Sequence, residues 1–375
     1  MAFLFILSLV QAWETGARMP TPRMAFATGR VGTRVFAIGG FGEDMRYPRA
    51  EVEAYDVEAD SWITGFAPMP WPRAYAGCAV LGGKIYVIGG TDTRMETNRV
   101  DRFDPGSNTW DTVASLPWPA QALGAAVLGN HLYAVGGYST YNEGRYLREV
   151  ACYVPTPAPG SWDTVYSLHV PRAGLGLAVS GDRMYAVGGT YFNPLASAEY
   201  YVLDQWRIEP MPMRHPRSGF PAVGYAEYIC AIGGHGRMNM GSVEVLNTLI
   251  GEWSDAESLP SARTEHGGAV VGDRIVVIGG REMHGLVGTV LTHPLFSGME
   301  EQSEEPFRRE AAQATVASGC VRLPGAGAWD VFDNAGKKVA AGAGPGEVRL
   351  SPGIYFVRTA LPDRSLTTYK VTIPR

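Results

Sequence analysis

Five arginines recur at matching places along the chain and form the most regular set of chemically capable side chains. Each opens an apolar, strand-like segment, four of them directly after a proline: Arg23, Arg73, Arg172, Arg217 and Arg263. If the repeated segments close into a ring, five guanidinium groups point toward one zone, which would suit a carboxylate, sulfate or acidic-peptide ligand. The alternative is that each arginine pairs with a backbone carbonyl or a carboxylate of the next repeat and supports the scaffold.

Aromatic and polar residues gather in the segments that follow six strand-ending glycine pairs. The candidate ligand-binding residues there are Tyr138, Tyr141, Asn142, Arg145, Tyr191, His235 and Arg281, with Tyr146, Phe192 and Asn193 beside them. Aromatic rings next to Asn and Arg suit sugar stacking or a protein-binding hot spot, although exposed loop aromatics also occur without a ligand. These residues favour a non-catalytic module that binds a protein or a glycan.

A catalytic alternative needs a converging acid and base. Glu265 and His266 are the adjacent candidates, and they leave open a carbohydrate-active enzyme such as a sugar mutarotase or epimerase. A radical-copper oxidase would need two Tyr, two His and a Cys–Tyr cross-link. It is less favoured, because Tyr75 and Cys78 are three residues apart and fall on opposite faces of a strand. We expect no catalytic residues, no metal site and no cofactor.

The elements that position these residues repeat six times. Glycine pairs end apolar strands at Gly39-Gly40, Gly89-Gly90, Gly136-Gly137, Gly188-Gly189, Gly233-Gly234 and Gly279-Gly280, at intervals of 50, 47, 52, 45 and 46 residues. A tryptophan precedes each pair by 26 or 27 residues: Trp13, Trp62, Trp110, Trp162, Trp206 and Trp253. A period near 50 with several strands per unit is typical of propeller repeats. These markers resemble the kelch family.

The resemblance implies an all-β fold, a six-bladed kelch β-propeller over residues 13–296. The last repeat has no tryptophan after Gly280, while Trp13 lies 26 residues before the first glycine pair. We therefore expect the N-terminal strand to complete the sixth blade and close the ring, which removes two exposed sheet edges.

Residues outside the repeats indicate export. Residues 1–12 resemble a signal peptide, and residues 297–318 read as a charged linker. Residues 319–375 show strand patterns with turn residues between them, which predict a small β-sandwich-like domain. The motifs Asp333-Asn334-Ala335-Gly336-Lys337 and Leu350-Ser351-Pro352-Gly353-Ile354-Tyr355 resemble the type A sorting domains of the type IX secretion system. That resemblance implies the secretion machinery as a partner and a secreted or cell-surface protein.

Composition limits the partners. The formal net charge of −5 gives no electrostatic reason to expect nucleic acid as a partner. The apolar run from Met1 to Val10 is too short to span a bilayer as a helix, so no transmembrane segment is expected. The four cysteines have neither disulfide-framework nor zinc-site spacing, which favours buried free thiols.

Overall fold

The computed structural model describes residues 12–92, 94–141, 144–155 and 158–295, together with seven strands beyond residue 314. The chain divides into two compact units, Met1–Ser297 and Gly298–Arg375. Most of the signal segment predicted at residues 1–12 lies outside the described residues. Within the described residues, no helix combines the length and the hydropathy needed to cross a membrane.

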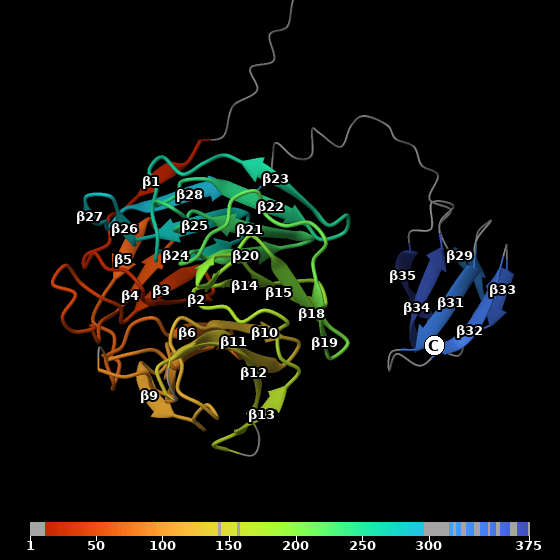
Figure 1. Ribbon diagram of the computed structural model, residues 1–375, viewed down its shortest axis with the longest axis horizontal. Coiled ribbons are helices and arrows are strands. Elements are labelled where there is room, and N and C mark those ends of the chain that lie inside the picture. The colour runs from red at the N-terminus through yellow and green to blue at the C-terminus, as the bar shows by residue number, and fades with distance from the viewer. Residues whose placement is uncertain are drawn as a thin grey trace, which may run out of the picture. The chain divides into compact units, whose positions relative to one another are not determined.

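The described strands of the first unit form six four-stranded antiparallel sheets, or blades, around a common centre (Figure 1). Listed from the inner strand outward, blade 1 contains β2 (Ala27–Val31), β3 (Arg34–Ile38), β4 (Val52–Asp56) and β5 (Ser61–Ile63). Blade 2 contains β6 (Gly77–Leu81), β7 (Lys84–Ile88), β8 (Val100–Asp104) and β9 (Thr109–Thr112). Blade 3 contains β10 (Gly124–Leu128), β11 (His131–Ser139), β12 (Arg145–Val154) and β13 (Ser161–Val165).

The other three blades follow the same order. Blade 4 contains β14 (Gly176–Ser180), β15 (Arg183–Val187), β18 (Ala198–Val202) and β19 (Gln205–Ile208). Blade 5 contains β20 (Ala222–Tyr225), β21 (Tyr228–Ile232), β22 (Val243–Asn247) and β23 (Glu252–Ala256). Blade 6 contains β24 (Gly267–Val271), β25 (Arg274–Ile278), β28 (Val290–Pro294) and β1 (Glu14–Gly16). Short hairpins β16 (Thr190–Tyr191) with β17 (Asn193–Pro194), and β26 (Arg281–Glu282) with β27 (Gly285–Leu286), extend blades 4 and 6.

The N-terminal strand supplies the outer edge of blade 6. β1 pairs antiparallel with β28, so that Glu14 faces Thr292 and Gly16 faces Val290. The indole N–H of Trp13 donates to the carbonyl of Glu257 in blade 5 at 3.1 Å. The ring therefore closes by joining segments from opposite ends of the first unit.

The hydrophobic core lies between adjacent blades. The second strand of each blade is a nearly continuous apolar run because both of its faces are covered; Val35, Phe36 and Ile38 in β3 are at most 1% exposed. One core cluster joins Tyr86 and Ile88 of blade 2 to residues of blade 3. Burial of apolar area between blades is thus the main stabilising term.

The repeated tryptophans tie each blade to the one before it. The indole N–H of Trp62 donates to the carbonyl of Ala17 at 2.8 Å, and that of Trp110 to the carbonyl of Ala67 at 2.9 Å. Trp162 and Trp253 make the equivalent bonds to Ala114 and Met211. In the described part of the chain the indole N–H of Trp206 has no such acceptor.

The glycine pairs are required by geometry. In blade 1, Gly39 and Gly40 have φ angles of 67° and 85°. A Cβ atom on Gly39 would lie 2.5 Å from the carbonyl oxygen of Arg73 in the next blade. Only glycine combines this backbone conformation with so close an approach.

The second unit contains two sheets among its described strands. One has the order β29 (Thr315–Ala317), β30 (Cys320–Leu323) and β33 (Gly346–Arg349); the other has the order β32 (Lys338–Ala343), β31 (Ala328–Asp333), β34 (Gly353–Ala360) and β35 (Leu366–Ile373). β29 lies inside the segment 297–318 that was expected to be a linker. Most of that segment, and the turns that carry the sorting-type motifs, lie outside the described residues.

Candidate functional site

The five strand-opening arginines lie inside the blades. Each is at most 1% exposed, and each pairs with a carboxylate: Arg23 with Glu53, Arg73 with Asp101 and Arg172 with Glu199, all at 2.8 Å, Arg217 with Glu244, and Arg263 with Glu282 at 3.0 Å. The guanidinium groups therefore do not face a common zone, as an anion-binding ring would require. They support the scaffold. The sequence had suggested a carboxylate partner in the next repeat, but each partner lies in the same blade as its arginine.

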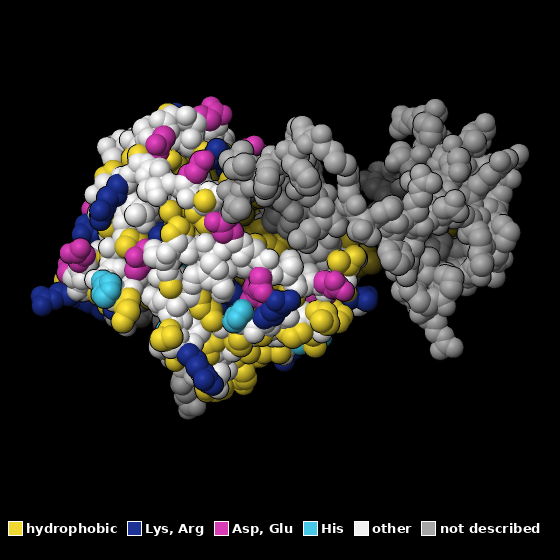
Figure 2. All heavy atoms as spheres, turned by 90° about the horizontal axis from the view of Figure 1, so that it is seen from above, with side chains coloured by type: hydrophobic (Ala, Val, Ile, Leu, Met, Phe, Trp, Pro, Cys, Tyr) yellow, Lys and Arg dark blue, Asp and Glu magenta, His cyan; other side chains and the backbone are white. Residues whose placement is uncertain are grey.

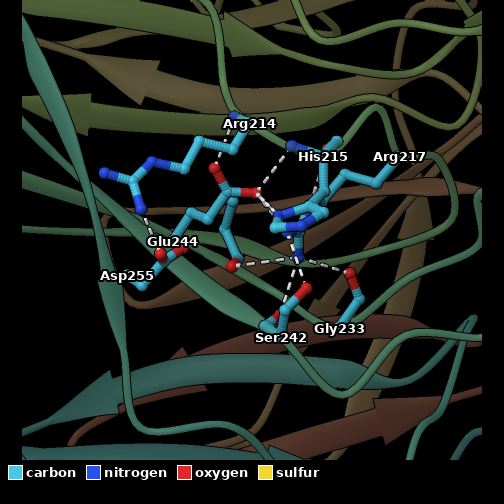
Figure 3. Close-up of polar contacts among 8 residues, drawn as sticks. Arg214, His215, Arg217, Gly233, Ser242, Glu244 and Asp255 are labelled. Atoms are coloured by element: carbon cyan, nitrogen blue, oxygen red, sulfur yellow. Dashed lines mark hydrogen bonds and ion pairs between the residues drawn. The ribbon is translucent and has the colours of Figure 1, made fainter.

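Blade 5 shows the arrangement in detail (Figure 3). The Arg217 guanidinium donates to the carbonyls of Gly233 and Ser242, at 2.8 and 2.7 Å, and pairs with Glu244. Burial lowers the pKa of Arg217, and the charge of Glu244 opposes that shift. The guanidinium thus fastens the end of β21 to β22.

The same region brings His215, Glu244 and Asp255 close together, with possible ligand atoms within 4.8 Å of one another. Both carboxylates already face an arginine, since Arg214 pairs with Asp255 and Arg217 pairs with Glu244. A cation would have to displace two guanidinium groups. This cluster does not fit a metal site.

Blade 3 lacks both members of the pair. Ala120 occupies the arginine position, and Ala151 faces Ala134 in the register where blades 1, 2, 4 and 5 carry the carboxylate. A lone buried charge of either sign would be strongly destabilising. The two departures therefore compensate each other.

A cavity of about 1000 Å³ opens at the centre of the ring. Its rim carries side chains that follow the glycine pairs of blades 5 and 6, among them His235, Asn239, Arg281 and Met283. Its deeper wall is apolar and includes Leu123, Ala125, Leu175, Leu177 and Phe220. An apolar cavity with a few converging polar groups is typical of a ligand site.

Six residues at equivalent positions form a neck in this cavity: Ala25, Tyr75, Ala122, Gly174, Gly219 and Glu265. All have φ between 52° and 62°. Each donates its backbone N–H to the carbonyl of its counterpart in the preceding blade, at 2.7 to 2.9 Å, which closes a circle of hydrogen bonds. The neck is therefore a rigid part of the scaffold.

Two neck positions carry large side chains. The hydroxyl of Tyr75 donates to Oε1 of Glu265 at 2.8 Å, joining blades 2 and 6 across the neck. Burial raises the pKa of the Glu265 carboxyl, while the Tyr75 hydrogen bond and the charges of Arg281 and His235 oppose that shift. Bulky residues rarely adopt positive φ, and such strain is concentrated at functional sites.

The Glu265–His266 pair does not converge as an acid and a base. The His266 imidazole is buried against Gly233 and Gly280, and no hydrogen bond between it and Glu265 is seen in the described residues. Burial, and secondarily the charge of Arg263, hold the pKa of His266 well below its usual value. His266 occupies a packing position that Phe26, Leu123 and Phe220 fill in other blades.

Cys152 and Cys230 are buried, and Cys78 is half-buried. Cys78, Cys152 and Cys230 are free, and Cys78 lines the cavity. Burial raises the pKa of the Cys78 thiol to about 12, which keeps it protonated and unreactive at neutral pH.

A second feature is an aromatic cluster formed by Tyr138, Tyr146, Tyr191 and Phe192, of which Tyr191 and Phe192 are exposed and the other two are half-buried. Tyr138 and Tyr146 face each other across the β11–β12 hairpin with ring centroids 5.3 Å apart. Tyr146 then reaches Tyr191 and Phe192 of the β16–β17 hairpin, at 5.7 and 5.4 Å. Phe192 is 75% exposed and has φ of 60°. The cluster thus spans blades 3 and 4.

The structure separates the loop residues that the sequence grouped. Tyr138 and Tyr191 belong to the aromatic cluster, whereas His235 and Arg281 lie on the rim of the cavity. Tyr141 is 67% exposed, and Arg145 pairs with Glu149 at 2.6 Å. Asn142 lies outside the described residues. Sequence reasoning missed the Tyr75–Glu265 bridge, although aligned repeats show only Ala or Gly at the other four neck positions.

On the face seen in Figure 2, the described surface has no large patch of only positive or only negative charge. Basic and acidic side chains there are interspersed with hydrophobic ones. The modest net charge of −5 agrees with this.

Comparison with known proteins gives consistent matches. The KLHDC2/KLHL20/DRC7 Kelch-repeats domain matches residues 8–189, and the Kelch motif matches residues 171–211. Kelch-like protein 23 of Homo sapiens is 27% identical over 69% of this chain and 46% of its own length. Kelch-like protein 7 of Rattus norvegicus is 36% identical over 58% of this chain and 37% of its own length. The chain thus spans about half the length, or less, of these relatives.

The solved structure of YjhT is similar in fold, with a TM-score of 0.64 at 15% identity, covering 75% of this chain and 97% of that one. The repeats, the six blades and these matches agree: this chain contains kelch-repeat domains folded as an all-β, six-bladed β-propeller.

Proposed function

We propose that the propeller is a non-catalytic binding module whose ligand is a protein, held by the aromatic cluster of blades 3 and 4. The observation that carries the proposal is the cluster itself. Phe192 is 75% exposed in the β16–β17 turn, and its ring packs against Tyr146 of the neighbouring blade and against Tyr191. Aromatic rings from two blades that pack together and leave Phe192 in water form a preassembled contact surface, which recognition explains better than stability does.

The chemistry of the cluster favours a protein over a glycan. Edge-to-face rings supply a rigid contact with little side-chain entropy to lose, as in protein-binding hot spots. The neighbouring Arg145 is neutralised by Glu149, so the surroundings offer little charge to an anionic sugar. Glycan binding at the same cluster remains the competing outcome of the test.

The test compares Phe192→Ala with Leu203→Ala. Leu203 is a matched control because it is 72% exposed, has φ of 51° and lies in the β18–β19 turn of the same blade. A displayed peptide library and a glycan array are screened with the wild-type protein. We expect to select peptides that bind the wild type. Their affinity should fall at least about tenfold for Phe192→Ala and should not change for Leu203→Ala.

Two results would overturn the proposal. Glycans alone could bind in a Phe192-dependent way, which would make the cluster a sugar site. Alternatively, selected peptides could bind Phe192→Ala as well as the wild type, which would remove the cluster from function.

We also propose that the protein is exported to the surface or the medium, with the second unit as its sorting signal. The support is the sequence pattern of residues 319–375 and the folding of residues 298–375 as a separate compact unit. Deleting residues 319–375 and fractionating the native host tests this. Normal delivery of the truncated protein would rule the sorting role out.

A further inference from the structure

Among the described residues, large side chains narrow the neck of the central cavity on the side of blades 2 and 6. Tyr75 and Glu265 bridge it from blades 2 and 6. Ala122, Gly174 and Gly219, from blades 3 to 5, place at most a methyl group in it. The opening therefore lies opposite the bridge and leads to the apolar wall below.

The deeper part of the cavity is suited to an apolar group. Leu123, Leu175 and Phe220 line it. The titratable side chains there, Cys78 and His266, are neutral near pH 7, since burial raises the pKa of the thiol to about 12 and holds that of the imidazole well below its usual value. A group entering from the rim would exchange water for apolar contacts.

Polar groups with spare hydrogen-bonding capacity meet at the neck. Tyr75 donates to Oε1 of Glu265, and no hydrogen bond from the described residues reaches Oε2. Arg281 lines the same cavity, is exposed, and makes no ion pair with the described residues. Asn239 holds its backbone by donating to the Arg281 carbonyl at 3.2 Å.

Charge decides which head group fits. Burial favours the protonated Glu265 carboxyl, although Tyr75, Arg281 and His235 oppose the rise in its pKa. A protonated carboxyl donates a hydrogen bond to an anion, and a guanidinium pairs with one. An amine would instead meet the Arg281 and His235 side chains.

We propose that this cavity binds a small amphipathic carboxylic acid. Its carboxylate lies between Glu265 and Arg281, and its apolar body passes Gly174 and Gly219 to reach Leu175 and Phe220. This site is separate from the aromatic cluster and does not rest on the proposed protein-binding function.

Calorimetry with three eight-carbon probes tests the head group: octanoate, 1-octanol and octylamine. We expect octanoate to bind with one site per chain, at least about tenfold more tightly than the other two. Arg281→Gln, an exposed change that leaves the fold intact, should cost at least about tenfold in octanoate affinity. Octylamine or octanol binding as tightly as octanoate, or no octanoate binding, would overturn the proposal.

Blocking the opening tests the route. Ala122→Tyr places a large side chain in the neck. The backbone should accept it, because Ala122 has φ of 52° and the equivalent position in blade 2 is already a tyrosine, Tyr75, with φ of 54°. The substitution should abolish octanoate binding. Leu203→Tyr is the matched control, since Leu203 is 72% exposed, has φ of 51° in the β18–β19 turn and does not line the cavity. Equal octanoate binding by a folded Ala122→Tyr protein would refute the route.

The pH dependence tests the role of Glu265. Octane-1-sulfonate is the probe, because its charge is constant. As pH rises, ionised Glu265 repels an anion, so affinity should fall with rising pH; the measurement is made in a His235→Gln background, so that the rim imidazole adds no titration of its own. Glu265→Gln keeps an acceptor for the Tyr75 hydroxyl and should remove that dependence. An unchanged pH profile in Glu265→Gln would exclude Glu265 from the site, while Phe192→Ala should leave all these measurements unaltered.

Discussion

Replacing one member of a buried ion pair should lower the stability of the protein far more than replacing both members. In blade 1, Arg23 is 0% exposed and pairs with Glu53, whose side chain is 6% exposed, at 2.8 Å. The guanidinium also donates to the carbonyls of Gly39, Glu51 and Ala37. Glu53→Leu leaves these bonds in place but leaves the buried charge without its counter-ion.

The magnitude follows from the burial of both partners. Removing one member of a buried pair costs about 3–5 kcal/mol, whereas replacing both by apolar residues of similar volume is often close to neutral. We therefore expect Glu53→Leu and Arg23→Met each to lower the free energy of unfolding by roughly 3–5 kcal/mol. The double variant should lie within about 2 kcal/mol of the wild type, as blade 3 with Ala120 and Ala151 suggests.

Urea unfolding at constant m-value measures these differences. The exposed pair Arg34–Asp56 of the same blade is the control; Arg34 is 48% exposed in its side chain, and breaking this pair should cost about 0–1 kcal/mol. If the two single effects simply add in the double variant, the buried pair is not energetically coupled and the explanation of blade 3 fails.

Two further predictions concern stability. Trp13→Ala should lower the urea midpoint about as much as Trp110→Ala, because both half-buried rings donate to a carbonyl of the preceding blade. Loss of an aromatic side chain costs up to about 3–5 kcal/mol. An unchanged midpoint would show that Trp13 does not secure closure. The native state keeps His266 neutral while the unfolded state takes up a proton, so the free energy of unfolding of the wild type should fall as the pH decreases below about 6.5. His266→Leu should make this dependence on pH weaker. Equal losses in both proteins between pH 7.5 and 5.0 would refute this.

The sequence alone was sufficient for the repeats and for the closure that they imply. Gly39-Gly40 and its five counterparts mark a backbone conformation that other residues rarely adopt, so their spacing is visible without coordinates. Trp13 kept the same distance to the first pair, which placed the N-terminal strand against β28. Such local constraints are readable because each is carried by one residue type at one interval.

The role of the five arginines could not be decided from the sequence. Their register was clear from the sequence and favoured a scaffold role, but a recurring Arg is also compatible with a ligand-binding ring. Burial to 1% or less and pairing within the same blade decided between the two. That information depends on which way a side chain points from its strand, and spacing along the chain does not specify it.

The central site was decided by tertiary structure alone. Tyr75 and Glu265 are 190 residues apart, yet their side chains meet at 2.8 Å because ring closure brings blades 2 and 6 to either side of blade 1. Tyr146 and Phe192 likewise meet only where blades 3 and 4 adjoin. Contacts between distant segments follow from how the blades pack around the axis, so the sequence determined the scaffold and the folded ring determined which side chains share a site.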